Sequence, residues 1–170
     1  MTTKKKTILV ALDDSEASQR VLSYTAEQAK AADGLHVLLC HVLPALPPSL
    51  LESRGAEDPD EERRIEAAQL NEQVRWTAEQ TPAGERLLES SRRRLQTLGV
   101  PTERIHTKLV EPADVHGRLA ETLLATARAA HCDMIIVGRH AFSALREVLH
   151  THLADALQAN ARGLEVRIID

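Results

Sequence analysis

Aromatic residues are almost absent from this chain of 170 residues, which has a single tyrosine, tryptophan and phenylalanine, Tyr24, Trp76 and Phe142. Proteins that bind single-stranded nucleic acid stack several bases on aromatic side chains. The formal net charge is −4, whereas a polyanion partner favours a basic surface. We therefore expect a core of Leu, Val, Ile and Ala, and no nucleic-acid partner.

Cysteines and long apolar segments are also scarce. Cys40 and Cys132 each stand in or beside an apolar run, far apart in the sequence, and this pattern predicts buried, reduced thiols instead of a disulfide framework or a zinc site. No segment approaches the roughly 20 apolar residues of a membrane span, and the amino terminus leads directly from MTTKKK into the short run ILVAL. We expect a cytoplasmic protein with no membrane partner.

What the chain does contain is a series of short apolar, β-branched runs. Most of them are continuous, as in parallel strands that are buried on both faces. Long helical segments separate them, which predicts an α/β fold with helices on both faces of a parallel sheet. We expect one domain, residues 1–170, with strands at 7–13, 35–43, 104–111, 133–138 and 164–170.

The expected helices begin and end at recognisable residues. Ser15 and Asp58 are suitable N-caps, and Thr81 with Pro82 predicts that one helix stops and another starts there. Residues 114–130 and 143–161 complete the set. Residues 44–98 are longer than a minimal crossover needs, so we expect a long mobile loop, pinned to the body by Leu50 and Leu51, followed by extra helices.

Two groups of polar residues are candidate sites. Asp13 ends the first expected strand, where a carboxylate could hold a ribose hydroxyl, an adenine amine or a metal, or where residues 13–15 could simply cap the next helix. His140, His150 and His152 could meet at a metal. However, His150 and His152 are two apart and diverge on a helix, so we expect no metal site.

Motifs for nucleophilic catalysis and for a standard phosphate loop are missing. There is no G-x-x-x-x-G-K-[ST], G-x-G-x-x-G or G-x-S-x-G. Ser143 has no neighbouring base at motif spacing, and Lys108 lies within an expected strand, which argues against a phospho-acceptor domain. We expect that the protein is not an enzyme.

Three stretches in the right order resemble the universal stress protein family. They are TILVALDDSEASQRVLSYTAEQA, LHVLLCHVLP and PADVHGRLAETLLATARAAHCDMIIVGRHAFSALREVLHTHLADAL. The resemblance implies a three-layer α/β sandwich with a five-stranded parallel sheet of order 3-2-1-4-5, of the adenine nucleotide alpha-hydrolase-like kind. It also implies that Asp13 and Gly138 share one crevice, and that a homodimer forms through the C-terminal strand.

The family's nucleotide motif, G-x2-G-x9-G-[ST], is largely replaced here. Gly138 matches its first glycine, but Ala141, Thr151 and His152 stand at the other positions. A β-branched Thr151 would be strained at positive φ, and His152 is bulkier than serine. The resemblance therefore implies a universal stress protein that does not bind ATP and acts in stress response as a dimer, through an unknown protein partner.

A second function remains open, in which ATP or AMP binds to a rewritten phosphate loop. Asp13 matches the acidic residue that ATP-binding members use near adenosine. Gly138, His140, Ser143 and His152 would then meet phosphate, with Arg139 close enough in sequence to help. A flavoprotein subunit of the same architecture is a third possibility.

Overall fold

The computed structural model describes residues 5–52, 55–111, 118–139, 141–142 and 153–170. Its centre is a parallel sheet in the order β3-β2-β1-β4-β5. This order confirms the 3-2-1-4-5 sheet that the sequence predicts. The strands are β1 (Lys6–Ala11), β2 (Leu35–Val42), β3 (Ile105–Val110), β4 (Met134–Gly138) and β5 (Glu165–Ile169).

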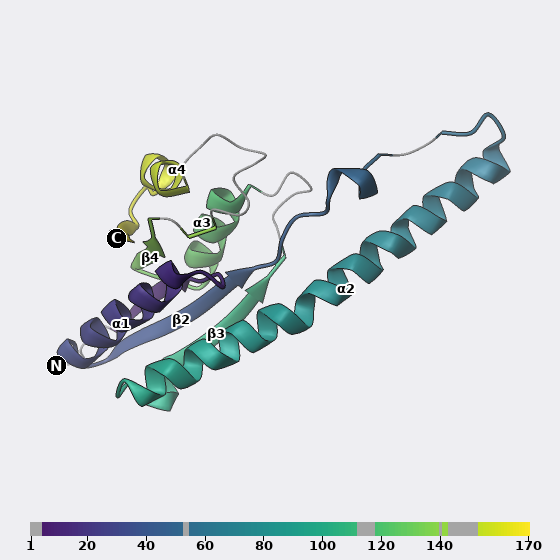
Figure 1. The fold of residues 1–170 in the computed structure, drawn as a ribbon. Coiled ribbons are helices and arrows are strands. Elements are labelled where there is room, and N and C mark those ends of the chain that lie inside the picture. Colours follow the sequence, from purple (N-terminus) through teal and green to yellow (C-terminus); the bar gives the residue numbers. More distant parts are fainter. Residues whose placement is uncertain (1–4, 53–54, 112–117, 140, 143–152) are drawn as a thin grey trace.

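Helices cover both faces of the sheet, which makes three layers (Figure 1). On one face, α1 (Glu16–Ala31) and α2 (Pro59–Thr97) contribute to one apolar core; on the other, α3 (Leu119–Ala129) and α4 (Leu153–Asn160) contribute to a second core. β4 is buried along its whole length, as a continuous apolar run in a parallel sheet should be. No helix among the described residues is long and apolar enough to cross a membrane.

The helix ends follow local sequence signals. Ser15 has the extended backbone of an N-cap, although its hydroxyl donates to Asp13 and makes no capping hydrogen bond, and Gly34 adopts a φ of +80° in the turn into β2. Asp58 accepts a hydrogen bond from Asp60 N, and Pro59 begins α2, as predicted. Residues 114–117 and 143–152 of the last two expected helices lie outside the described residues.

The prediction of a break at Thr81–Pro82 is wrong, because α2 is a single helix of 39 residues with Pro82 inside it. Proline removes the hydrogen bond to the carbonyl group four residues earlier. Here that carbonyl belongs to Ala78, and both residues are exposed, so water can take the place of the missing bond. Thr77 and Thr81 each donate a hydroxyl hydrogen bond to the carbonyl four residues before them, at 3.1 Å, in the turns that precede Pro82.

The two halves of α2 have different surroundings. The carboxyl-terminal half buries Gly84, Leu88, Ser91 and Leu95 against the sheet. The other half, residues 59–83, extends beyond the sheet (Figure 1), and we call it the arm. At 1.5 Å per residue the whole helix is about 58 Å long.

The connection before α2 contains a short 3-10 turn, η1 (Pro48–Leu50), and a second such turn, η2 (Thr102–Arg104), precedes β3. The Nε2 atoms of Gln69 and Gln73 donate hydrogen bonds to the Leu50 carbonyl oxygen at 2.9 and 2.7 Å. The connection is therefore tied to the arm at Leu50, whereas the sequence predicted an attachment to the body.

Candidate functional site

Asp13 lies just after β1, at the carboxyl edge of the sheet, where open α/β sheets hold ligands. One carboxylate oxygen, Oδ1, accepts hydrogen bonds from Ser15 N at 3.1 Å, from Ser18 Oγ at 2.8 Å and from Ser15 Oγ. The other, Oδ2, accepts one from the backbone N–H of Phe142. A carboxylate has about four acceptor positions, and four donors already point at this one.

These donors also decide the charge of Asp13. Partial burial acts to raise the pKa of its carboxyl group, but the hydrogen bonds from Ser15, Phe142 and Ser18 together outweigh it. The pKa lies below its ordinary value of 3.8, because hydrogen bonds to a carboxylate favour the charged form. Asp13 is therefore a charged residue whose hydrogen bonds come from within the protein.

Gly138 ends β4 and lies directly against the first turn of α1. A Cβ atom added at Gly138 would be 2.8 Å from the Cβ of Ala17 and 3.5 Å from its backbone carbonyl carbon. Real Cβ atoms do not approach so closely, so only glycine fits between this strand and this helix. In the described structure Gly138 thus has a packing role that does not depend on a phosphate.

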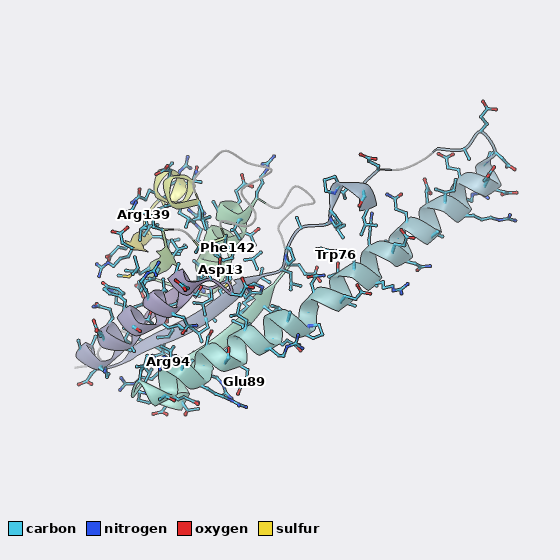
Figure 2. The ribbon with its side chains drawn as sticks, viewed as in Figure 1. Asp13, Trp76, Glu89, Arg94, Arg139 and Phe142 are labelled. Atoms are coloured by element: carbon cyan, nitrogen blue, oxygen red, sulfur yellow. The ribbon has the colours of Figure 1, made fainter. Side chains whose placement is uncertain are left out.

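The start of the loop after β4 folds inward. Ala141 and Phe142 are each only 6% exposed and belong to the second core. Phe142 adopts a φ of +61°, which is unusual for an aromatic residue, and this conformation turns its N–H toward Asp13. Figure 2 shows Asp13 and Phe142 close together beside the sheet.

Arg139 points to another part of the molecule. Its backbone N–H donates to the Ile169 carbonyl oxygen at 2.8 Å, and its guanidinium group pairs with the Asp170 carboxylate. Both partners belong to the end of the chain, at and after β5. The side chain that could have assisted a phosphate is therefore held by an acidic residue.

The structure brings Asp13 and the start of the loop after Gly138 together, which is the proximity that the resemblance implies. His140, Ser143 and His152, together with His150 and Thr151, lie outside the described residues. Within the described part of the chain, no group of three or more potential ligands could hold a metal ion.

The two cysteines behave as predicted, since both are free and buried. Burial raises the pKa of the Cys40 thiol to about 12 and that of Cys132 to about 11. Thiols with such pKa values are protonated at neutral pH and therefore poor nucleophiles.

Two residues that surround Asp13 were missed by the sequence analysis, Ser18 and Phe142. Ser18 has a detectable signal: it is a polar residue on the buried stripe of the first helix, between Ala17 and Val21. A buried hydroxyl needs a hydrogen-bond partner, and here the Ser18 hydroxyl donates to Asp13 at 2.8 Å. Phe142 has no comparable signal, because the backbone N–H that it contributes is common to nearly every residue.

Comparison with solved structures shows the same fold in other proteins. A universal stress protein from Burkholderia pseudomallei is 23% identical, with 97% of this chain and 96% of that chain covered and a TM-score of 0.59. A universal stress protein from Archaeoglobus fulgidus, solved in complex with dAMP, is 17% identical, with 97% and 98% covered and a TM-score of 0.57. Another, solved in complex with cAMP, is 15% identical, with 98% of both chains covered and a TM-score of 0.57.

A sequence comparison with curated proteins gave no match. The model of the universal stress protein family, in contrast, matches residues 5–162. This match includes β1, the Asp13 turn, the loop after β4 and α4, so it covers the whole candidate site. With the strand order and the paired Asp13 and Gly138 segments already described, it leads to one conclusion: this chain belongs to the universal stress protein family.

Proposed function

We propose that this protein is a universal stress protein that does not bind ATP and that acts in stress response through protein partners, without catalysis. In this proposal it is a cytoplasmic homodimer that needs no cofactor. The observation that carries the proposal is the state of Asp13, whose carboxylate is occupied by Ser15, Ser18 and Phe142.

A nucleoside would have to compete with these internal hydrogen bonds. To free Oδ2 of Asp13, the Phe142 N–H would have to give up its partner, and a buried N–H without a partner is costly. Because Phe142 is also packed in the second core, the loop cannot move away without exposing an aromatic ring. The replacement of three of the four motif positions by Ala141, Thr151 and His152 supports the same proposal.

The proposed dimer uses the edge of the sheet at β5. This strand pairs with β4 on one side, and its residues are only partly buried. An unpaired strand edge offers N–H and C=O groups to another chain. The side chains of Val166, Ile168 and Ile169 would add apolar contacts.

The second candidate function is ATP or AMP binding by a rewritten phosphate loop. The observation that favours it is that structures of the same fold have been solved with dAMP and with cAMP. In this case Asp13 would exchange its internal partners for the adenosine moiety, and Gly138, His140, Ser143 and His152 would surround the phosphates.

Calorimetric titration with ATP, with and without magnesium, distinguishes the two functions. The protein would first be examined by mass spectrometry for a co-purified nucleotide. We expect no bound nucleotide and no heat at millimolar ATP. Micromolar binding that is abolished in Asp13→Ala but kept in Asp14→Ala would overturn the proposal and establish the nucleotide function, because Asp14 is the exposed neighbour.

A further inference from the structure

A regular stripe of apolar and small residues runs along α2 from the arm into the body. Its positions alternate between steps of three and four residues, which is the heptad pattern of helices that pack side by side. We call this stripe the seam, and its members are Ala67, Leu70, Val74, Thr77, Thr81, Gly84, Leu88, Ser91 and Leu95.

The seam is covered in one half of the helix and open in the other. Gly84, Leu88, Ser91 and Leu95 are the residues that α2 buries. In the arm, Leu70 and Val74 are 59% and 62% exposed, and they are the exposed large hydrophobic residues of the described structure. Within the described part of the chain, the pattern that attaches the helix to the sheet thus continues to Leu70 and Val74, where the apolar side chains are largely exposed.

We propose that the arm pairs with the arm of a second copy of this chain, in antiparallel orientation, through the open part of the seam. The pairing has its two-fold axis at residue 72. Leu70 then packs on Val74 of the partner subunit, and Ala67 packs on Thr77 of the partner subunit. This contact is separate from the dimer proposed at β5 and does not rest on it.

The length of the arm supports a second copy as the occupant. With the axis at residue 72, position 63 of one helix lies opposite position 81 of the other. The open part of the seam in one copy is therefore covered by the same part of the second copy. The next seam position, Gly84, is already buried by the body and corresponds to residue 60, at the start of the helix. The open seam therefore ends where the partner helix ends, and the two bodies lie at opposite ends of the pair.

The charges favour the antiparallel orientation. Arg63 lies four residues before Ala67, at the position that continues the heptad spacing, and a parallel pair in register would place it against its own copy. In the antiparallel pair it faces Thr81 of the partner subunit instead. Beside the seam, equivalent flanking positions of the two helices face each other, offset by two residues from the seam register. Arg64 then meets Ala78, Glu66 meets Gln80, and Asn71 and Gln73 each meet their own copy, so no like charges are opposed.

Sedimentation velocity of the full chain, across a wide range of protein concentration, tests this pairing. The seam variant is Leu70→Glu/Val74→Glu. The control variant, Ala68→Glu/Ala83→Glu, adds the same charge at two exposed positions of the same helix that lie off the seam. We expect the dissociation constant of the arm-mediated complex to rise by about tenfold or more in the seam variant and by less than about twofold in the control.

The outcomes separate this proposal from the dimer at β5. If the seam variant sediments like the wild type at every concentration, the arm pairing is wrong, whether or not a β5 dimer is present. A wild type that forms a larger assembly, reduced to a dimer in the seam variant, supports both contacts. A wild-type dimer that becomes a monomer in the seam variant supports the arm pairing alone.

Cross-linking tests the orientation. Arg64→Cys and Ala78→Cys proteins would be mixed and treated with a short bismaleimide, and the native cysteines are buried and should not react. Antiparallel pairing predicts covalent dimers in the mixture and none in either protein alone. Dimers formed by each variant with itself would overturn the antiparallel pairing.

Discussion

Asp13 accepts hydrogen bonds from two segments that are far apart in the sequence, the start of α1 and the loop after β4. The carboxylate therefore holds the end of β1, the first turn of α1 and this loop in one arrangement. Because each of these donors needs an acceptor, the negative charge of the carboxylate and the number of its lone pairs both contribute to holding this arrangement.

We expect Asp13→Asn to lower the free energy of unfolding by about 2 kcal/mol at neutral pH, since one carboxylate oxygen is replaced by a donor that faces other donors. Urea denaturation measures this, with Asp14→Asn as the control. The folded-state pKa of Asp13 is depressed, so its contribution is present above its ordinary pKa of 3.8 and is lost as the pH falls through the lower folded-state value. A difference between variant and wild type that stayed constant on acidification would contradict this explanation.

Gly138→Ala should lower the free energy of unfolding by about 1–3 kcal/mol, because the added methyl group meets the Cβ of Ala17. Ala17→Gly removes that methyl group, so the double variant should lose less stability than the sum of the two single changes. A double-mutant cycle in urea measures the coupling. Strictly additive effects would show that the contact with Ala17 is not the cause.

The placement of Asp13 and Gly138 at the same edge of the sheet was predictable, because each stands at the end of an apolar run and the resemblance to the family implies that their strands are neighbours. The sequence was not sufficient to predict what Asp13 binds. The N–H of Phe142 reaches Asp13 through a φ of +61°, and no residue-type preference predicts such a conformation for phenylalanine.

Among the secondary-structure elements, α2 shows most clearly how tertiary contacts override a local signal. Proline inside a helix costs about 3 kcal/mol, and on that basis the sequence predicted two helices. Burial of Leu88 and Leu95 fixes the helix on one side of Pro82, and the hydrogen bonds of Gln69 and Gln73 to Leu50 fix it on the other. The seam was visible in the sequence as an apolar stripe, but its spacing does not say which half is covered.

We expect Pro82→Ala to stabilise the arm by about 1–3 kcal/mol, because it restores a hydrogen bond to the Ala78 carbonyl group and removes a steric conflict. Amide hydrogen exchange should become slower in residues 59–81 and should change little in the strands. Ala83→Gly is a matched destabilising control at an exposed position of the same helix. Unchanged exchange in the arm of the Pro82→Ala protein would mean that the proline does not limit its stability.

At the scale of the whole molecule, the pH dependence of stability should reflect a pair of histidines on neighbouring strands. The rings of His36 in β2 and His106 in β3 are stacked with centroids 5.6 Å apart, and Nδ1 of the first lies 3.3 Å from Nε2 of the second. Burial lowers the pKa of His36 below its ordinary value of 6.5, and Lys5, His106 and Arg104 lower it further.

A depressed histidine pKa means that the unfolded chain binds a proton more readily than the folded one. The contribution of His36 is therefore present above its ordinary pKa of 6.5 and is lost as the pH falls below it. We expect thermal denaturation to show a loss of stability in this range that is smaller in His36→Gln. Equal slopes in the two proteins would exclude His36 as the cause.

The strand order was predictable because the apolar runs are distinct and the resemblance to the family implied how they are arranged. The elongated shape of the molecule was not predictable. Whether a helix continues past a sheet depends on contacts between residues that lie far apart in the sequence.

The strand order also has a consequence for synthesis on the ribosome. β1 lies in the middle of the sheet, but one of its two neighbours, β4, begins only at Met134. After β3 is complete at Val110, 28 residues remain to be added before the end of β4 at Gly138. At typical translation rates this takes about 1–6 seconds. During that interval the nascent chain presents an apolar strand edge, and we expect it to depend on chaperone protection until β4 emerges.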